Sequence, residues 1–189
     1  MLIGKNIALK PVTIADAQIL ADWVSDPSVL GEFFNIWPES KLAMEQKLAE
    51  RGKIDREEGG RFIITSVDDS KRMGNIGYFS PFTLKEFFKG LEIFYVIHPD
   101  FRGQGIATQA AGLLVNHLFD ATPVEHIQAS VVVGNEDSCR VLEKIGMQKD
   151  GLYRGVYFLH GRYVDLHLYS ILRQEWKNEK SYRQRCPEF

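Results

Sequence analysis

Two kinds of block alternate along this chain, and the spacing of their apolar residues distinguishes them. Short blocks rich in β-branched and aromatic residues are typical of strands. These blocks cover residues 6–12, 60–67, 73–80, 91–99, 126–135, 153–161 and 162–172. The polar residues 68–72 join the second and third blocks, and His160-Gly161 joins the last two. Each of these pairs therefore predicts an antiparallel hairpin.

Other blocks have the spacing of helices. The clearest follows Gly105, because its apolar positions recur every three to four residues and share one face. The residues on that face are Ile106, Ala110, Leu113, Leu114, His117 and Leu118. An earlier helix is expected from Thr13, its N-cap, to about Ser25. Residues 40–57 and 136–146 predict two more.

The order of these elements predicts the fold class. Hairpins give antiparallel strand pairs, whereas a helix between two strands allows a parallel pair. The middle of the chain reads strand, helix, strand, helix, and hairpins flank it. We therefore expect an α+β fold with a mixed, mainly antiparallel central sheet and one parallel strand–helix–strand crossover.

Composition favours one domain without a nucleic-acid or membrane partner. The chain has 189 residues, and 44% of them are hydrophobic, which suffices for one core. We expect this domain to cover residues 1–176, with a polar tail over 177–189. The 23 basic and 25 acidic residues form no long basic run. No apolar run has membrane-spanning length, and the start carries no cleavable leader. Cys139 and Cys186 suggest no disulfide framework, so we expect a cytoplasmic protein.

The segment between the strand 91–99 and the following helix carries Arg102, Gly103 and Gly105. Such glycines suit a plain turn, a dinucleotide loop or another phosphate site. A dinucleotide loop has a third glycine where Thr108 stands, and an acid ending the next strand, whereas Glu125 begins it. A Walker loop continues with Gly-Lys-Ser/Thr, which is missing here. A plain turn explains one glycine, but not two beside an arginine.

A phosphate site explains every part of this segment. The N-terminus of a helix has unpaired N–H groups and carries the positive end of the helix dipole. Glycines let the backbone approach a bulky anion closely. Arg102 adds a positive charge. The sequence therefore favours a phosphate-bearing ligand at this loop.

The pattern Arg-x-x-Gly-x-Ala of residues 102–107 resembles the coenzyme A-binding signature of the GNAT superfamily of acyl-CoA-dependent N-acetyltransferases. Residues 90–110 resemble that family's fourth strand, loop and third helix, and residues 135–151 resemble its next motif, Asn-x-x-Ser with a leucine-rich helix. Residues 8–29 and 157–172 resemble the opening and the closing hairpin of the RimJ/RimL branch. The best-known members of that branch acetylate the N-termini of ribosomal proteins.

The resemblance implies the GNAT fold, with helices on both faces of the sheet, and acetyl-CoA as cosubstrate. It places the loop amides around the pyrophosphate and a bulge of the fourth strand beside the pantetheine arm. The cofactor-binding residues that it implies are Val96, Ile97, His98, Arg102, Gly103, Gln104, Gly105, Ile106, Ala107, Thr108, Asn135 and Ser138. No metal is expected, because the five histidines lack metal-ligand spacing.

Transfer of an acetyl group to an amine needs a base for the amine and a donor for the leaving thiolate. Glu92 lies in an apolar strand, where an acid is costly without a partner, so it is the candidate base. The alternative is a structural carboxylate, either bonded to a neighbouring strand or on an exposed face. The resemblance makes Ser138 the candidate donor, since the following helix lacks the tyrosine of other members. Asn135 is also a favoured N-cap, and Cys139 is expected to be inert.

The expected function is direct acetyl transfer from acetyl-CoA to a primary amine. The acceptor is either a protein or peptide α-amine, as in RimJ/RimL-type enzymes, or a small molecule such as a polyamine, an amino acid or an aminoglycoside. A non-catalytic acyl-CoA-binding module on the same fold is the alternative. The aromatic loops 33–37 and 85–90 either cover the core or line the acceptor site. A monomer or a homodimer is expected.

Overall fold

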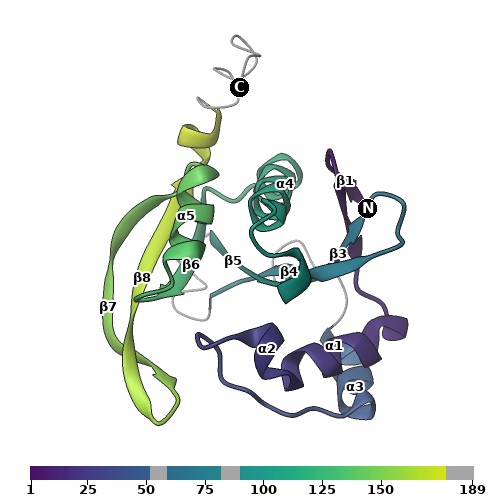
Figure 1. Ribbon diagram of the computed structural model, residues 1–189. Coiled ribbons are helices and arrows are strands. Elements are labelled where there is room, and N and C mark those ends of the chain that lie inside the picture. Colours follow the sequence, from purple (N-terminus) through teal and green to yellow (C-terminus); the bar gives the residue numbers. More distant parts are fainter. Residues whose placement is uncertain (52–58, 82–89, 178–189) are drawn as a thin grey trace.

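The computed structural model describes residues 1–51, 59–81 and 90–177, and an eight-stranded sheet lies at its centre (Figure 1). The strands are β1 (Leu2–Ile3), β2 (Ile7–Pro11), β3 (Gly59–Ser66), β4 (Arg72–Phe79), β5 (Gly90–Ile97), β6 (His126–Val132), β7 (Gln148–Leu159) and β8 (Arg162–Leu172). The helices are η1 (Ile14–Asp16), α1 (Ala17–Ser25), α2 (Pro27–Leu30), α3 (Lys41–Arg51), η2 (Pro99–Phe101), α4 (Ile106–Ala121) and α5 (Glu136–Lys144), where η marks a 3₁₀ turn.

The strand order is β1-β2-β3-β4-β5-β6-β8-β7, and among the described strands β5 and β6 are the one neighbouring pair that runs parallel. Helix α4 connects these two strands, so the predicted α+β fold with one parallel crossover is confirmed. The strands β5 and β6 pair only from Gly90 opposite His126 to Glu92 opposite Gln128. Beyond that point β5 pairs with β4 and β6 pairs with β8. A fork therefore lies between β5 and β6, and it opens toward the loop before α4.

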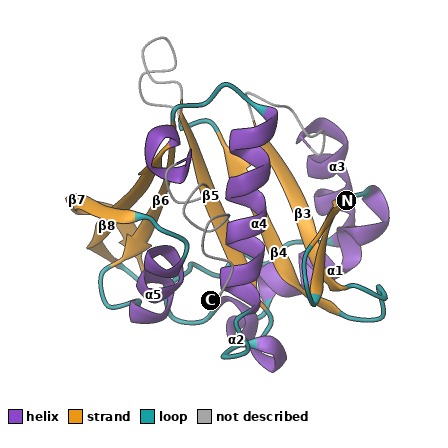
Figure 2. Cartoon of the chain, turned by 90° about the horizontal axis from the view of Figure 1, so that it is seen from above, coloured by secondary structure: helices purple, strands orange, loops and turns teal. Residues whose placement is uncertain are grey.

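The two faces of the sheet bury separate apolar clusters. Leu9 and Ile64 pack in one cluster with residues of α4 such as Leu114. Ile63 points to the other face and packs with Leu20 of α1. Figure 1 shows α4 on one side of the sheet and the helices α1, α2 and α3 on the other, and the view from above in Figure 2 shows α4 lying over the sheet. The predicted placement of helices on both faces is confirmed, and alternation along each strand is its cause.

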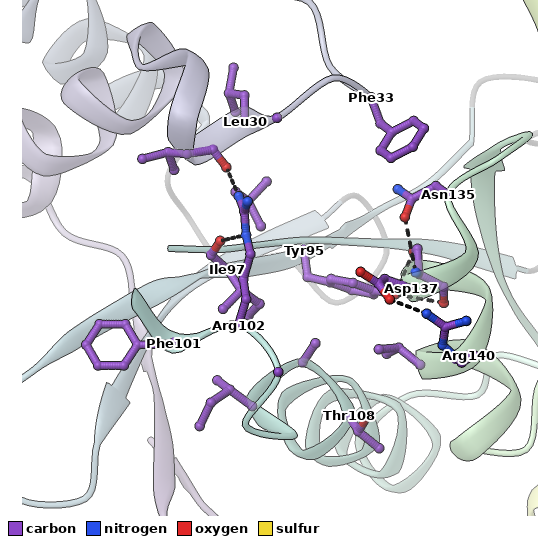
Figure 3. Close-up of a pocket in the computed structure, with 18 of the residues that line it drawn as sticks. Leu30, Phe33, Tyr95, Ile97, Phe101, Arg102, Thr108, Asn135, Asp137 and Arg140 are labelled. Atoms are coloured by element: carbon purple, nitrogen blue, oxygen red, sulfur yellow. Dashed lines mark hydrogen bonds and ion pairs between the residues drawn. The ribbon is translucent and has the colours of Figure 1, made fainter. Parts of the chain in front are cut away.

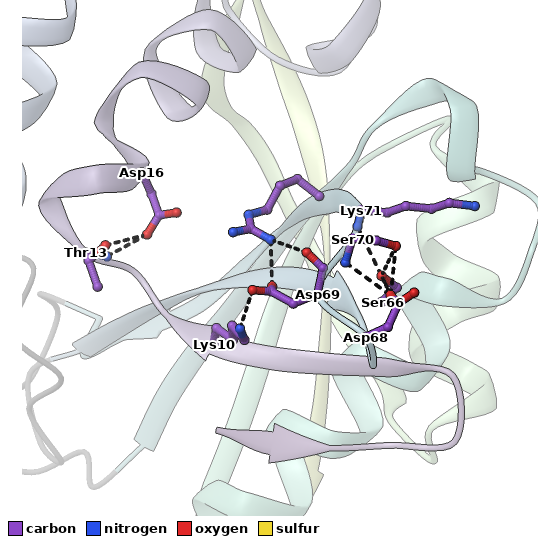
Figure 4. Close-up of polar contacts among 9 residues, drawn as sticks. Lys10, Thr13, Asp16, Ser66, Asp68, Asp69, Ser70 and Lys71 are labelled. Carbon is purple, nitrogen blue, oxygen red and sulfur yellow. Dashed lines mark hydrogen bonds and ion pairs between the residues drawn. The ribbon is translucent and has the colours of Figure 1, made fainter.

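The first helix ends at Ser25 as predicted, but its start differs, because a 3₁₀ turn capped by Thr13 precedes it. The N–H and the hydroxyl of Thr13 donate to Asp16 Oδ2 at 2.8 and 2.9 Å, and they close a 3₁₀ turn before α1 (Figure 4). One residue, Asp26, separates α1 from Pro27, which begins α2 because the first turn of a helix needs no N–H from that residue. Asp26 caps this short helix by accepting a bond from Ser28 N at 2.8 Å.

Other predicted bounds shift as well. The described part of the helix expected over residues 40–57 ends at Arg51, and its remainder lies outside the described residues. Strand β7 begins at Gln148, earlier than predicted, because it pairs with β8 along most of its length. The expected tail lies outside the described residues from 178 onward, as does Cys186. None of the described helices is both long and apolar enough to span a membrane.

The turn between β3 and β4 is fixed by side-chain bonds (Figure 4). The Asp68 carboxylate accepts bonds from the Ser66 hydroxyl and from the N–H and hydroxyl of Ser70, the latter two at 3.1 and 2.8 Å. These bonds, above all the one from Ser66, lower the pKa of Asp68 to about 2. Asp69 adds an ion pair with Lys10 on β2, at 2.6 Å.

The loop between α2 and α3 is joined to the β7–β8 hairpin. Asn35 Nδ2 donates to the carbonyl of Phe158 at 2.6 Å, and Asn35 Oδ1 accepts from the backbone N–H of His160 at 3.3 Å. The His160 ring also lies 3.1 Å from the carbonyl of Glu32. Segments that are far apart in sequence therefore meet here.

Candidate active site

A pocket of about 500 Å³ lies where β5 leaves β6, between the start of α4, helix α5 and the loop after α2 (Figure 3). Its size is typical of small-molecule sites. The described residues that line it are Val29, Leu30, Gly31, Glu32, Phe33, Phe34, Tyr95, Val96, Ile97, Phe101, Arg102, Gly103, Gly105, Ile106, Ala107, Thr108, Asn135, Asp137, Ser138, Arg140, Val141 and Lys144.

The loop before α4 has a backbone shape that depends on its two glycines. Gly103 and Gly105 have φ values of 72° and 74°, which other residues rarely adopt. A Cβ built on either glycine meets no atom within 4 Å, so the space above the loop is open. Gly105 is the N-cap of α4 and provides no side-chain cap. The free N–H groups and the positive dipole end of this 16-residue helix therefore suit an anion such as a phosphate.

Arg102 lines the pocket, and its guanidinium donates hydrogen bonds to backbone carbonyls of two neighbouring elements. The Nε group donates to the carbonyl of Ile97 at 3.0 Å, and Nη2 donates to the carbonyls of Val29 and Ser28 at 2.6 and 3.3 Å (Figure 3). These contacts fasten the end of β5 to α2. The guanidinium thus has backbone partners while it lines the pocket, and its expected contribution to phosphate binding stays a prediction.

Helix α5 contributes two positively charged side chains to the pocket lining. Arg140 and Lys144 stand one helical turn apart and both line it. Arg140 forms an ion pair with the exposed Asp137 on the same helix. Sequence reasoning missed both cations, because charges on the exposed face of a helix are ordinary and nothing local marks them as a site.

The structure gathers most of the predicted site residues around this pocket. Those that line it are Val96, Ile97, Arg102, Gly103, Gly105, Ile106, Ala107, Thr108, Asn135 and Ser138. His98 lies outside the lining, and its ring packs 6.3 Å from Trp23 and 6.1 Å from Phe101. Gln104 also lies outside it and donates to the carbonyl of Asp100 at 2.9 Å. Cofactor contact by the side chains of His98 and Gln104 is therefore not supported by their placement.

Glu92 lies at the closed end of the fork and outside the described pocket lining. It occupies the last position at which β5 pairs with β6. Its Oε2 accepts a bond from Gln128 Nε2 on β6 at 2.8 Å. The strand-bonded carboxylate that the sequence left open is thus present.

Asn135 and Ser138 lie together at the start of α5. Asn135 Oδ1 accepts the backbone N–H of Ser138 at 3.2 Å, so Asn135 is the helix N-cap and also lines the pocket. The Ser138 hydroxyl lies 2.8 Å from the hydroxyl of Tyr95, which reaches over from β5. Burial raises the pKa of Tyr95 to about 12. Cys139 is buried and lies outside the described lining, in line with an inert thiol.

Sequence reasoning missed Tyr95 as a site residue. Alternation along β5 places it on the face toward α4, where a tyrosine is usual in a core. Its partner Ser138 lies 43 positions later, so no local pattern joins the two. Of the predicted aromatic loops, Phe33 and Phe34 line the pocket, while residues 85–89 lie outside the described part of the chain.

Comparison with known families shows to which family this chain belongs. A family model described as an acetyltransferase (GNAT) domain matches residues 6–148. This chain belongs to the GNAT acetyltransferase family. It is therefore an acetyl-CoA-dependent N-acetyltransferase, and the fold and cosubstrate expected from the signature at residues 102–107 are confirmed.

Proteins that resemble this N-acetyltransferase in sequence or fold differ in the acceptors that their names give. It is 30% identical to the uncharacterized N-acetyltransferase YoaA of Bacillus subtilis over 173 residues, 89% of this chain and 94% of that one. The ribosomal-protein-S5-alanine acetyltransferase of Vibrio fischeri has the same fold, with a TM-score of 0.80 at 19% identity over 92% and 97% of the two chains. The spermidine N-acetyltransferase of Vibrio cholerae, solved with CoA and spermine, also has this fold. Its TM-score is 0.79 at 18% identity, over 93% of this chain and 100% of that one. The acceptor therefore has to be argued from the site.

The pocket suits coenzyme A on its own geometry. The open space above Gly103 and Gly105 and the uncapped start of α4 fit a pyrophosphate. The basic side chains of Arg140 and Lys144 add positive charge for phosphate groups. Within the described ranges, no three His, Cys, Asp or Glu side chains come together as a metal site would require.

Proposed function

We propose that this N-acetyltransferase acetylates the α-amine of a peptide or protein, as RimJ/RimL-type enzymes do. The observation that carries the proposal is the position of the acid Glu92 at the closed end of the fork, already bonded to Gln128. A site with one such base suits an amine that gives up its proton readily. The proposal includes a cytoplasmic location.

Acceptor chemistry supports an α-amine over a lysine or a polyamine. A free α-amine has a pKa of about 7.7–8.0, whereas an alkyl amine such as lysine has one of about 10.4. At pH 7.5 roughly a third of α-amines are neutral, against about one alkyl amine in a thousand. The described lining carries Glu32 and Asp137 against three cations, Arg102, Arg140 and Lys144. This balance does not favour a polycationic acceptor.

In this mechanism acetyl-CoA would lie along the pocket. The first N–H groups of α4 would bind its pyrophosphate, and the backbone at Val96 and Ile97, freed from β6 by the fork, would bind its pantetheine arm. Acetyl-CoA supplies the acetyl group as a reactive thioester. Phe33 and Phe34, held by the bonds of Asn35 to the hairpin, would cover the arm and exclude water.

Two side chains then handle protons and charge. Glu92 takes a proton from the acceptor amine, directly or through a water molecule, so that the nitrogen can attack the thioester carbon. Ser138 donates a hydrogen bond to the sulfur as the carbon–sulfur bond breaks and its electron pair moves to sulfur. Direct transfer to the amine needs no covalent enzyme intermediate, which agrees with a buried Cys139.

Initial rates on matched acceptors test this proposal. Release of CoA is followed with a short peptide bearing a free α-amine and no lysine, an N-blocked lysine peptide, and spermidine. We expect kcat/KM to be at least tenfold higher for the free α-amine peptide. Faster turnover of spermidine or of the blocked lysine peptide would contradict the acceptor assignment. Binding of acetyl-CoA without CoA release on any acceptor would favour the non-catalytic module.

A further inference from the structure

The Ser138 hydroxyl is held in place from two sides. Its own backbone N–H is bound by Asn135 Oδ1 at 3.2 Å, which fixes the first turn of α5. Its Oγ lies 2.8 Å from the Tyr95 hydroxyl, which also lies 3.4 Å from the Ser138 carbonyl. Figure 3 shows the Tyr95 side chain extending from β5 toward α5. Both residues line the pocket, so their hydrogen bond is part of its wall.

The direction of this bond decides what Ser138 can do. A serine hydroxyl has one proton to donate and two lone pairs to accept with. Burial raises the pKa of Tyr95 to about 12, so its phenol keeps its proton at any ordinary pH. If that phenol donates to Ser138 Oγ, the serine proton is left for a partner inside the pocket. If Ser138 donated to Tyr95, it would have no proton for the pocket.

We infer that Tyr95 is a positioning residue for the leaving group. It donates to Ser138 Oγ and thereby directs the Ser138 hydroxyl proton toward the departing sulfur; this inference rests on the proposed role of Ser138. When the carbon–sulfur bond breaks, the electron pair stays on sulfur, and the chain from Tyr95 through Ser138 stabilises that charge by hydrogen bonds. No proton leaves Tyr95. The amine proton leaves by way of Glu92, and the thiolate takes up a proton from water after release.

A double-mutant cycle tests this chain. Tyr95→Phe keeps the ring in the pocket wall and removes the hydroxyl. We expect it to lower kcat about tenfold, because the Ser138 proton is then no longer directed at the sulfur, with the Kd of acetyl-CoA within twofold. Because Tyr95 acts through Ser138, the double variant Tyr95→Phe/Ser138→Ala should be no slower than Ser138→Ala alone.

The chain offers a matched control. Tyr169 on β8 is also a buried tyrosine whose hydroxyl donates to α5, in this case to Glu143 Oε1 at 3.1 Å, but it lies outside the described pocket lining. Tyr169→Phe therefore removes a bond to the same helix and leaves Ser138 untouched. We expect its kcat to stay within twofold of wild type. Unfolding temperatures show whether each variant is folded.

Three results would overturn the inference. One is a Tyr95→Phe enzyme with unchanged kcat while Ser138→Ala is slow. Another is additive losses in the double variant, which would mean that Tyr95 only shapes the wall. The third is an equal loss in Tyr169→Phe, which would point to general loosening of α5. Failure of the proposed function is a separate outcome, since the wild type would then release no CoA with any acceptor; that would overturn both.

Discussion

The backbone angle of Gly105 sets how closely a phosphate can approach the start of α4. Replacing it by valine puts a β-branched side chain at a φ of 74° and fills the open space above the loop. We expect Gly105→Val to raise the Kd of acetyl-CoA at least tenfold, which corresponds to about 1.4 kcal/mol. Calorimetric titration measures this directly.

Gly155 on β7 provides the control for backbone strain. It has a φ of 61°, and a Cβ there also meets no atom within 4 Å, but it lies outside the described pocket lining. Gly155→Val therefore imposes similar strain at a distance from the site. If both variants are folded and both bind acetyl-CoA like wild type, the loop is not the phosphate site.

Glu92 is the residue on which the acceptor's proton depends. Glu92→Gln keeps a hydrogen-bonding group opposite Gln128 and removes the base. An α-amine is mostly protonated well below its pKa of about 8 and mostly neutral above it, so the need for a base falls as the pH rises. We expect kcat/KM of the variant to fall at least tenfold at pH 6.5 and to approach wild type near pH 9. A pH–rate profile parallel to that of wild type would remove Glu92 from the mechanism, and Glu50→Gln on the exposed side of α3 is the control.

Among the elements, the β3–β4 turn makes stability depend on pH. The pKa of Asp68 is about 2 in the folded chain against an ordinary value of 3.8, so the folded state favours its charged form. The stability this gives is complete above about pH 4 and is lost as the pH falls toward 2. We expect the unfolding temperature of Asp68→Asn to drop less than that of wild type between pH 5 and pH 2. Equal drops would contradict this account, and Asp150→Asn on β7 controls for the loss of one surface carboxylate.

A contact between two elements, the α2–α3 loop and the β7–β8 hairpin, holds part of the pocket wall. Asn35 makes two hydrogen bonds to the hairpin, and the loop carries Phe33 and Phe34 of the pocket wall. Because each such bond contributes about 1 kcal/mol, Asn35→Ala should lower kcat/KM about three- to tenfold through a less ordered loop. Steady-state kinetics checks this against Asn6→Ala, a substitution of an exposed asparagine. Unchanged kinetics would mean that the loop keeps its place without these bonds.

At the scale of the whole molecule, local signals predicted the framework and distant contacts completed the site. The glycine loop was recognisable because a positive φ and a helix start are properties of adjacent residues such as Gly103 and Gly105. The bond between Tyr95 and Ser138 was not, since it depends on β5 and α5 packing together. Arg102 was predicted at the pocket, but its bond to α2 was not, because the carbonyl that it binds there lies 73 positions away in sequence. His98 was predicted to contact the cofactor, but it lies outside the described pocket lining, and its ring packs near the rings of Trp23 and Phe101.

The central claim is that the enzyme transfers the acetyl group of acetyl-CoA to an α-amine at this fork. It is tested most directly by one peptide that carries both a free α-amine and an internal lysine, incubated with acetyl-CoA and the enzyme. Tandem mass spectrometry of the product then locates the acetyl group within a single molecule, so differences in peptide binding cancel. The account predicts acetylation of the α-amine at least tenfold faster than of the lysine, because far more of it is neutral and a single base suffices. Acetyl groups found mainly on the lysine would contradict it.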